Sequence, residues 1–78
     1  MQLHTLDAVP EGGRARIDEI IECNAAPLLA GLGLLPGTMI SRIGKAPLGD
    51  PLVFAVRGAR LAIRRSHAEC VRVRSIET

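Results

Sequence analysis

The stretch Leu32-Gly33-Leu34-Leu35-Pro36-Gly37 most constrains what this chain can fold into, because it ends one kind of element and begins another. Gly33 can take the left-handed conformation that closes a helix, and Pro36 prevents the helix from resuming. Pro36-Gly37 suits a turn, since proline fixes φ and glycine tolerates a positive φ. The residues before this stretch therefore predict a helix, and the residues after it predict strands.

Five short strands are predicted from the alternation of apolar and polar residues. In the first, Ile20 interrupts the alternation, which predicts a bulge near Asp18-Glu19. Between the third and fourth, Gly58-Ala59 suits a type II′ two-residue hairpin. The expected strands span residues 14–22, 38–43, 52–57, 60–65 and 71–76.

A helix of about two turns is predicted between the first two strands. Asn24 is a good N-cap, Pro27 suits the first turn, and three leucines would share one face (Leu28, Leu29 and Leu32). A short turn is expected near Thr5, and Ser66-His67-Ala68-Glu69 matches a capping box. We therefore predict a mainly β fold. It is a small SH3-like antiparallel barrel of about five strands, with one short helix after the first strand and a capped turn before the last. An OB fold is the alternative, although its helix usually lies later in the chain.

The 78 residues are expected to form a single domain, 1–78. No run of 18 uncharged apolar residues occurs, so we expect no direct membrane insertion. Residues 1–5 lack a charged n-region and an apolar h-region, so no signal peptide is expected and a cytoplasmic location follows. Cys23 and Cys70 are too few for a disulfide scaffold and are expected to be free thiols.

The charges are unevenly distributed along the chain. Residues 1–37 carry two arginines against five carboxylates, a net charge of −3, whereas residues 38–78 carry eight cations against three carboxylates, a net charge of +5. Most of these arginines fall at alternate strand positions, which is typical of a solvated sheet face. Because Phe54 is the one aromatic residue, a stacking surface for nucleic acid is missing and no nucleic-acid partner is expected.

Four motifs, in this order, resemble the FeoA family of small cytosolic proteins of bacterial ferrous iron uptake. They are Leu32 to Gly37, Ala46-Pro47-Leu48-Gly49-Asp50-Pro51, Val56-Arg57-Gly58 and Leu61-Ala62-Ile63-Arg64, and the match covers roughly residues 14–73. The resemblance implies an SH3-like barrel that acts with FeoB, a membrane permease with a cytosolic GTP-binding domain. It also implies a relation to the SH3-like domain of iron-dependent repressors. In one departure, residues 24–31 are uncharged, where family members often carry basic residues.

Catalytic chemistry has little support in this sequence. Local spacing suggests no Ser-His-Asp or Cys-His arrangement, and no GxxxxGK[ST] phosphate loop is present, so we expect no enzyme. His67 and Cys70 are the candidate metal ligands, since imidazole and thiolate suit Zn²⁺ or Fe²⁺. Two ligands are too few for a firm site, so we expect no cofactor and at most weak Zn or Fe binding.

The expected function is therefore that of a non-enzymatic partner of a FeoB-like permease. The alternative is a metal-sensing or DNA-associated accessory domain related to iron-dependent repressors. The candidate partner-binding residues lie in two apolar loops and comprise Leu34, Leu35, Pro47, Leu48 and Asp50. Exposed apolar loop tips often mark contacts, with the permease or with a second copy of the chain. The sequence leaves open whether Leu48 belongs to this patch or to the core.

Overall fold

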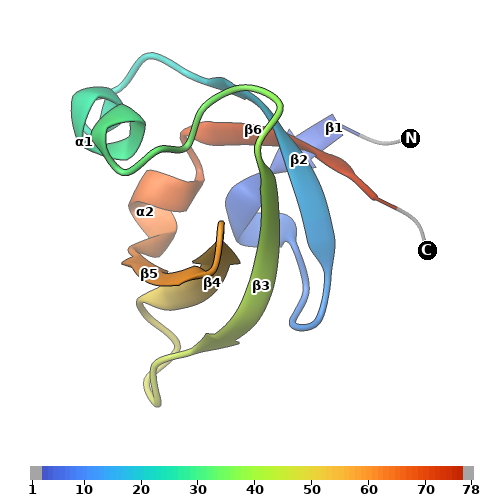
Figure 1. Ribbon diagram of the computed structural model, residues 1–78. Helices are drawn as coiled ribbons and strands as arrows, with labels where there is room; N and C mark the ends of the chain where they lie inside the picture. Colours follow the sequence, from blue (N-terminus) through green and yellow to red (C-terminus); the bar gives the residue numbers. More distant parts are fainter. Residues whose placement is uncertain (1–2, 77–78) are drawn as a thin grey trace.

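A strongly curved antiparallel sheet forms most of the computed structural model, which describes residues 3–76 (Figure 1). Its strand order is β1-β6-β2-β3-β4-β5. Two short α-helices and one 3-10 turn lie across the openings of the curved sheet. In chain order the elements are β1 (Leu3–Thr5), η1 (Leu6–Ala8), β2 (Arg14–Ile20), α1 (Ala26–Gly31), β3 (Met39–Lys45), β4 (Leu52–Val56), β5 (Ala59–Ile63), α2 (Arg65–Ala68) and β6 (Val71–Ser75).

The core is aliphatic except for Phe54, which is the largest of its fully buried side chains. The alternation within the strands turns one face inward, as in β4, where Leu52, Phe54 and Val56 are all buried. Val71 and Val73 of β6, a strand of the same curved sheet, are also buried on its inward face. The inward-facing positions expected from the sequence in these two strands are confirmed.

The bulge expected in the first strand is confirmed by the pairing of β2 with β6. Ile17 lies opposite Val73, Glu19 lies opposite Arg72, and Asp18 is the extra residue between them. The bulge restores the inward direction of the strand, so Ile20 packs against the core.

A sixth strand, β1, was not expected from the sequence. It is three residues long and pairs with β6 between Leu3↔Arg74 and Thr5↔Arg72. Three residues are too short to show a period of two, which explains why the pattern gave no signal. The short turn expected near Thr5 is present as η1.

The hairpin between β4 and β5 is confirmed, but its turn lies one residue earlier than expected. Val56 pairs with Ala59, so the two turn residues are Arg57 and Gly58. Both have positive φ, 51° and 81°, as a type I′ turn requires. The expected type II′ turn at Gly58-Ala59 is therefore wrong, because Gly58 occupies the second central position.

The N-cap of α1 lies one residue later than the cap expected at Asn24, and the helix begins at Ala26. Its N-cap is Ala25, with Pro27 in the first turn, and no side chain of the described residues caps it. Of the three leucines, Leu29 is buried, whereas Leu28 and Leu32 are exposed. Consecutive helical residues point in directions about 100° apart around the helix axis. When Leu29 points into the core, Leu28 therefore points away from it.

Asp50 caps the helix α2 from the loop between β3 and β4. Its Oδ1 accepts a hydrogen bond from the backbone N–H of Arg65 at 2.9 Å, and the Arg65 Nε donates to the Gly49 carbonyl at 2.8 Å. Arg64 is the N-cap residue by position and caps nothing with its own side chain. The capping box expected at residues 66–69 is therefore wrong, because the capping group comes from fifteen residues earlier in the chain.

A disulfide joins Cys23, which precedes α1, to Cys70, which precedes β6. Their Cα atoms lie 6.5 Å apart, within the range that a disulfide requires. The expectation of free thiols is therefore wrong. The two residues are 47 positions apart, so the fold, not their spacing in the sequence, brings them together.

We predict opposite effects for the same substitution at two glycines. Gly58→Ala should lower the free energy of unfolding by about 1 kcal/mol, because alanine is strained at a φ of 81°. Gly31→Ala, at the end of α1 with open space at its Cβ position, should raise it by roughly 0.5 kcal/mol. Urea denaturation measures both values. If both variants were stabilised, the turn geometry assigned to Gly58 would be contradicted.

We predict that Asp50→Ala lowers the free energy of unfolding by about 1 kcal/mol, because α2 loses its N-terminal acceptor. Asp50→Asn is the matched control: it retains a side-chain oxygen and is a comparably good cap, so its effect should be a few tenths of a kcal/mol. Equal losses in the two variants would show that the charge of Asp50, not its capping oxygen, matters.

Candidate partner-binding surfaces

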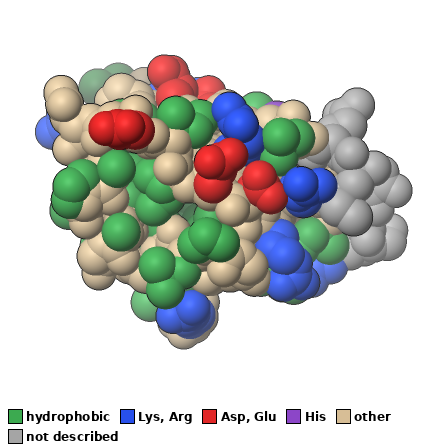
Figure 2. Space-filling view, turned by 90° about the horizontal axis from the view of Figure 1, so that it is seen from above, with side chains coloured by type: hydrophobic (Ala, Val, Ile, Leu, Met, Phe, Trp, Pro, Cys, Tyr) green, Lys and Arg blue, Asp and Glu red, His purple; other side chains and the backbone are tan. Residues whose placement is uncertain are grey.

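Three exposed leucines gather on and just after α1, and we call Leu28, Leu32 and Leu35 the α1 surface. Their exposed fractions are 55%, 39% and 47%. Leu28 and Leu32 are four apart and therefore neighbours on the helix. Seen from above, hydrophobic side chains gather on the left of the molecule, over α1, with acidic and basic side chains around them (Figure 2).

The segment that forms this surface carries no charge, and two cations from other strands lie at its edge: Arg16 donates to the Gly37 carbonyl at 2.9 Å and Arg57 to the Thr38 hydroxyl at 3.2 Å. No charged residue occurs between Glu22 and Arg42 in the sequence. Lone exposed leucines are normal on protein surfaces, but an apolar group without interspersed charge is typical of contact sites. The α1 surface is therefore a candidate for binding an apolar surface of a partner.

Two buried leucines hold the α1 surface in place. Leu29 from the helix and Leu34 from the following turn are both 0% exposed. Gly33, with a φ of 89°, reverses the chain between them, and Leu34 N–H donates to the Leu29 carbonyl at 3.3 Å. The break expected at Gly33 is thus present, and it turns Leu34 inward and Leu35 outward.

The structure divides the partner-binding residues expected from the sequence. Leu34 belongs to the core, so a surface contact through its side chain is excluded. Leu35 is exposed and joins the α1 surface. Asp50 is exposed but serves as the cap of α2.

Leu48 and Pro47 form an exposed tip at the far end of the molecule. The loop between β3 and β4 projects away from the sheet, at the end opposite to α1 (Figure 1). Leu48 is 98% exposed, which decides against its being a core residue. It lies apart from Leu35, so the single patch expected to combine the two loops does not form.

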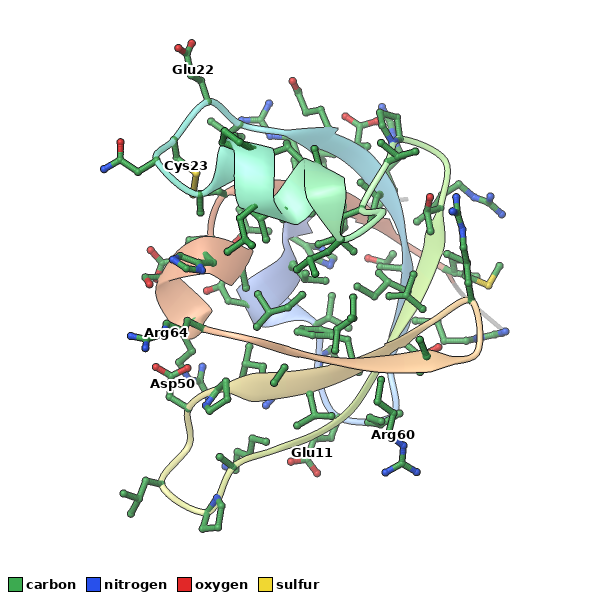
Figure 3. The ribbon with its side chains drawn as sticks, turned by 60° about the vertical axis from the view of Figure 1, so that its left-hand side comes forward. Glu11, Glu22, Cys23, Asp50, Arg60 and Arg64 are labelled. Carbon is green, nitrogen blue, oxygen red and sulfur yellow. A yellow bond between two sulfur atoms is a disulfide. The ribbon has the colours of Figure 1, made fainter. Side chains whose placement is uncertain are left out.

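A small open depression lies where this loop meets α2. It is lined by Asp50, Pro51, Ala62 and Arg64. Asp50 and Arg64 come from opposite sides of this junction (Figure 3). One oxygen of Asp50 already accepts a hydrogen bond from the backbone N–H of Arg65, so we do not assign a ligand site to the depression.

The candidate metal ligands are not assembled into a site. Cys70 is bonded to Cys23, which removes the thiolate that a metal would need. Among residues 3–76, no group of three or more His, Cys, Asp or Glu side chains is placed to hold a metal ion. Weak binding of Zn or Fe stays a prediction.

Many arginines are engaged within the chain. Arg72 pairs with Glu19 at 3.2 Å and Arg74 with Asp18 at 2.9 Å, and both pairs join partly exposed side chains of β6 and β2. Arg42 is one of the arginines whose alternate strand position predicted a solvated face, and this prediction is wrong, because Arg42 is buried and donates to the Val9 carbonyl at 2.9 Å. These partners reduce the charge available for phosphate contacts.

No helix within the described range is long and apolar enough to cross a membrane.

The FeoA domain family model matches residues 4–75. No curated protein matches the chain.

Two FeoA crystal structures are similar to the chain. The iron uptake regulatory protein FeoA is 30% identical, with a TM-score of 0.84, and the match covers 97% of this chain and 100% of that one. FeoA of Stenotrophomonas maltophilia is 31% identical, with a TM-score of 0.78, and the match covers 88% of this chain and 87% of that one. The S. maltophilia protein is described as a prokaryotic SH3 domain protein complexed with zinc.

IdeR from T. acidophilum also shares the fold. It is 22% identical, with a TM-score of 0.82, and the match covers 97% of this chain but 35% of that protein. At this identity the likeness concerns the fold alone. The family model, by contrast, spans nearly the whole chain, so this chain belongs to the FeoA family of ferrous iron transport accessory proteins and has its SH3-like fold.

Proposed function

We propose that this chain binds the cytosolic GTP-binding domain of a FeoB-like permease and thereby modulates ferrous iron uptake from the cytoplasm. The observation that carries the proposal is the α1 surface, an uncharged group of exposed leucines in a member of an iron-transport family. Like its family, the chain acts without catalysing a reaction.

The proposed mechanism is a bias on the state of the permease. A bound protein shifts a conformational equilibrium only if its affinities for the two states differ. The α1 surface would therefore bind the GTP-bound and GDP-bound forms of the permease domain with different affinities. Binding measurements with GDP and with a non-hydrolysable GTP analogue give this difference directly.

The shape of the α1 surface suits docking. Leu29 and Leu34 fix the helix and its turn from below, so the exposed leucines are ordered before a partner arrives. Pre-ordering reduces the entropy lost on binding. Pro47 and Leu48 are a separate, smaller contact in this proposal, because their loop lies at the opposite end.

DNA binding is the less favoured function. Its support is the fold shared with IdeR, and this chain covers 35% of that protein. The ion pairs of Arg72 and Arg74 and the burial of Arg42 engage three of the ten cations within the chain. We therefore propose no nucleic-acid partner.

We predict that Leu28→Asp weakens binding to the permease domain by roughly tenfold or more, the effect of losing a central apolar contact. The melting temperature should barely move, because Leu28 is exposed and aspartate is favourable in the first turn of a helix. Leu3→Asp is the matched control, since Leu3 is 48% exposed and lies on β1. Isothermal calorimetry and thermal denaturation provide the two readouts.

Leu48→Asp separates the two contacts. A single loop side chain should contribute less than the α1 surface, so its loss should weaken binding by a smaller factor than Leu28→Asp. If Leu48→Asp abolished binding while Leu28→Asp did not, the loop would be the docking site. If the α1 surface instead binds a second copy of the chain, sedimentation of the chain alone shows a dimer that Leu28→Asp disrupts.

A further inference from the structure

The disulfide lies at the base of the α1 surface. Cys23 is in the segment between β2 and α1, and Cys70 is in the turn between α2 and β6. In Figure 3, Cys23 stands at the entry to α1, above α2. The Ile21 N–H also donates to the Cys70 carbonyl at 2.6 Å, so the bond closes a junction already made by the backbone.

Both cysteines lie at the margin of the core and not within it. They are partly buried and pack against the buried cluster, whereas its central side chains are inaccessible. Thiol–disulfide exchange requires that an attacking thiolate reach a sulfur atom. Because Cys23 and Cys70 are only partly buried, the disulfide is not enclosed in the centre of the core.

Beside the disulfide, the entry to α1 is held by the buried side chain of Ala25 and by a hydrogen bond of 3.0 Å from the Ala26 N–H to the Cys23 carbonyl. The helix has six residues, too few to be stable alone, and within the described part of the chain no side chain caps it. Leu29 is its buried side chain. The covalent link to Cys70 therefore restrains the segment that leads into the helix more firmly than any single contact there.

We propose that Cys23 and Cys70 form a site of reversible thiol–disulfide exchange that controls the order of the α1 surface. The co-reactant is a low-molecular-weight thiol–disulfide pair of the glutathione class, or a dithiol oxidoreductase. In oxidation, one cysteine thiolate attacks the reagent disulfide, forms a mixed disulfide and releases one thiol. The second cysteine then displaces the second reagent thiol, so two cysteine thiols become one disulfide and the reagent disulfide becomes two thiols.

Reduction has a defined structural consequence. Without the bond, residues 21–37 are held by Leu29, Leu34 and backbone hydrogen bonds, while the strands keep their pairing. The α1 surface is then less ordered, and a partner must order it on binding. Regulation of the partner by this route rests on the proposed function, in which the α1 surface docks to the permease domain.

The redox site is tested first on the chain alone. The full chain is equilibrated in mixtures of reduced and oxidised glutathione, its free thiols are labelled with a maleimide and counted by mass spectrometry, and amide exchange is followed by NMR. We expect two thiols to appear together on reduction, with amide exchange in residues 21–37 faster by about tenfold or more and little change in β3 to β5. Failure to form the bond in any mixture, or equal exchange rates in the two states, would overturn the proposal.

The consequence for binding is tested on the permease domain with both forms of the chain. The oxidised form should bind about tenfold more tightly than the reduced form. The double variant Cys23→Ser/Cys70→Ser is the control: it should match the reduced form and ignore the glutathione mixture. Equal affinities of the two wild-type forms would overturn the redox control while leaving the proposed function intact. Absence of binding in both forms would overturn the proposed function and, with it, this regulation, while the exchange site itself stands on the first test.

Discussion

The structure depends on how a curved sheet with a small aliphatic core closes its openings. A domain of this size buries only about 60% of its unfolded surface, and this one has Phe54 as its single aromatic core residue. The sheet supplies most of the burial, but a curved sheet leaves openings where core side chains would meet water. In this chain η1, α1 and α2 cover them (Figure 1). Because each has at most six residues, none is stable without tertiary contacts.

Each α-helix is therefore held by interactions from distant parts of the chain. Leu29 anchors α1 in the core, and the disulfide ties its entry to the turn before β6. Asp50 caps α2 from another loop. The interactions that hold α1 also fix the positions of the exposed leucines of the α1 surface. The same contacts therefore stabilise the fold and order the proposed docking surface.

The sequence predicted those parts of the fold that depend on neighbouring residues. Alternation predicted the main strands, and the misplaced Ile20 predicted the bulge at Asp18, because a period of two is a local property. Features that depend on distant residues were missed. Asp50 caps a helix fifteen residues away, and Cys23 is bonded to a cysteine 47 residues away, so only the folded chain brings these groups together. The strand β1 was missed because it is too short to show a period.

The partner-binding residues could likewise be predicted only as far as they depend on neighbouring residues. The loop after the helix was recognised as apolar, but whether Leu34 or Leu35 points outward depends on the φ of Gly33 and the packing beneath it. Leu48 was correctly singled out as an unusual apolar tip, yet its distance from Leu35 is a property of the whole sheet. Leu28, Leu29 and Leu32 were expected to share one face, but a short helix does not reveal which part of that face is buried, and only Leu29 of the three is.

The proposed function depends on the α1 surface being the place where the partner docks. The most direct measurement is an NMR titration of the isotope-labelled chain with the cytosolic domain of the permease. We expect chemical-shift changes and signal broadening to concentrate on residues 26–36, with residues 46–51 much less affected. Changes confined to residues 46–51, or to the edge strand β5, would contradict it.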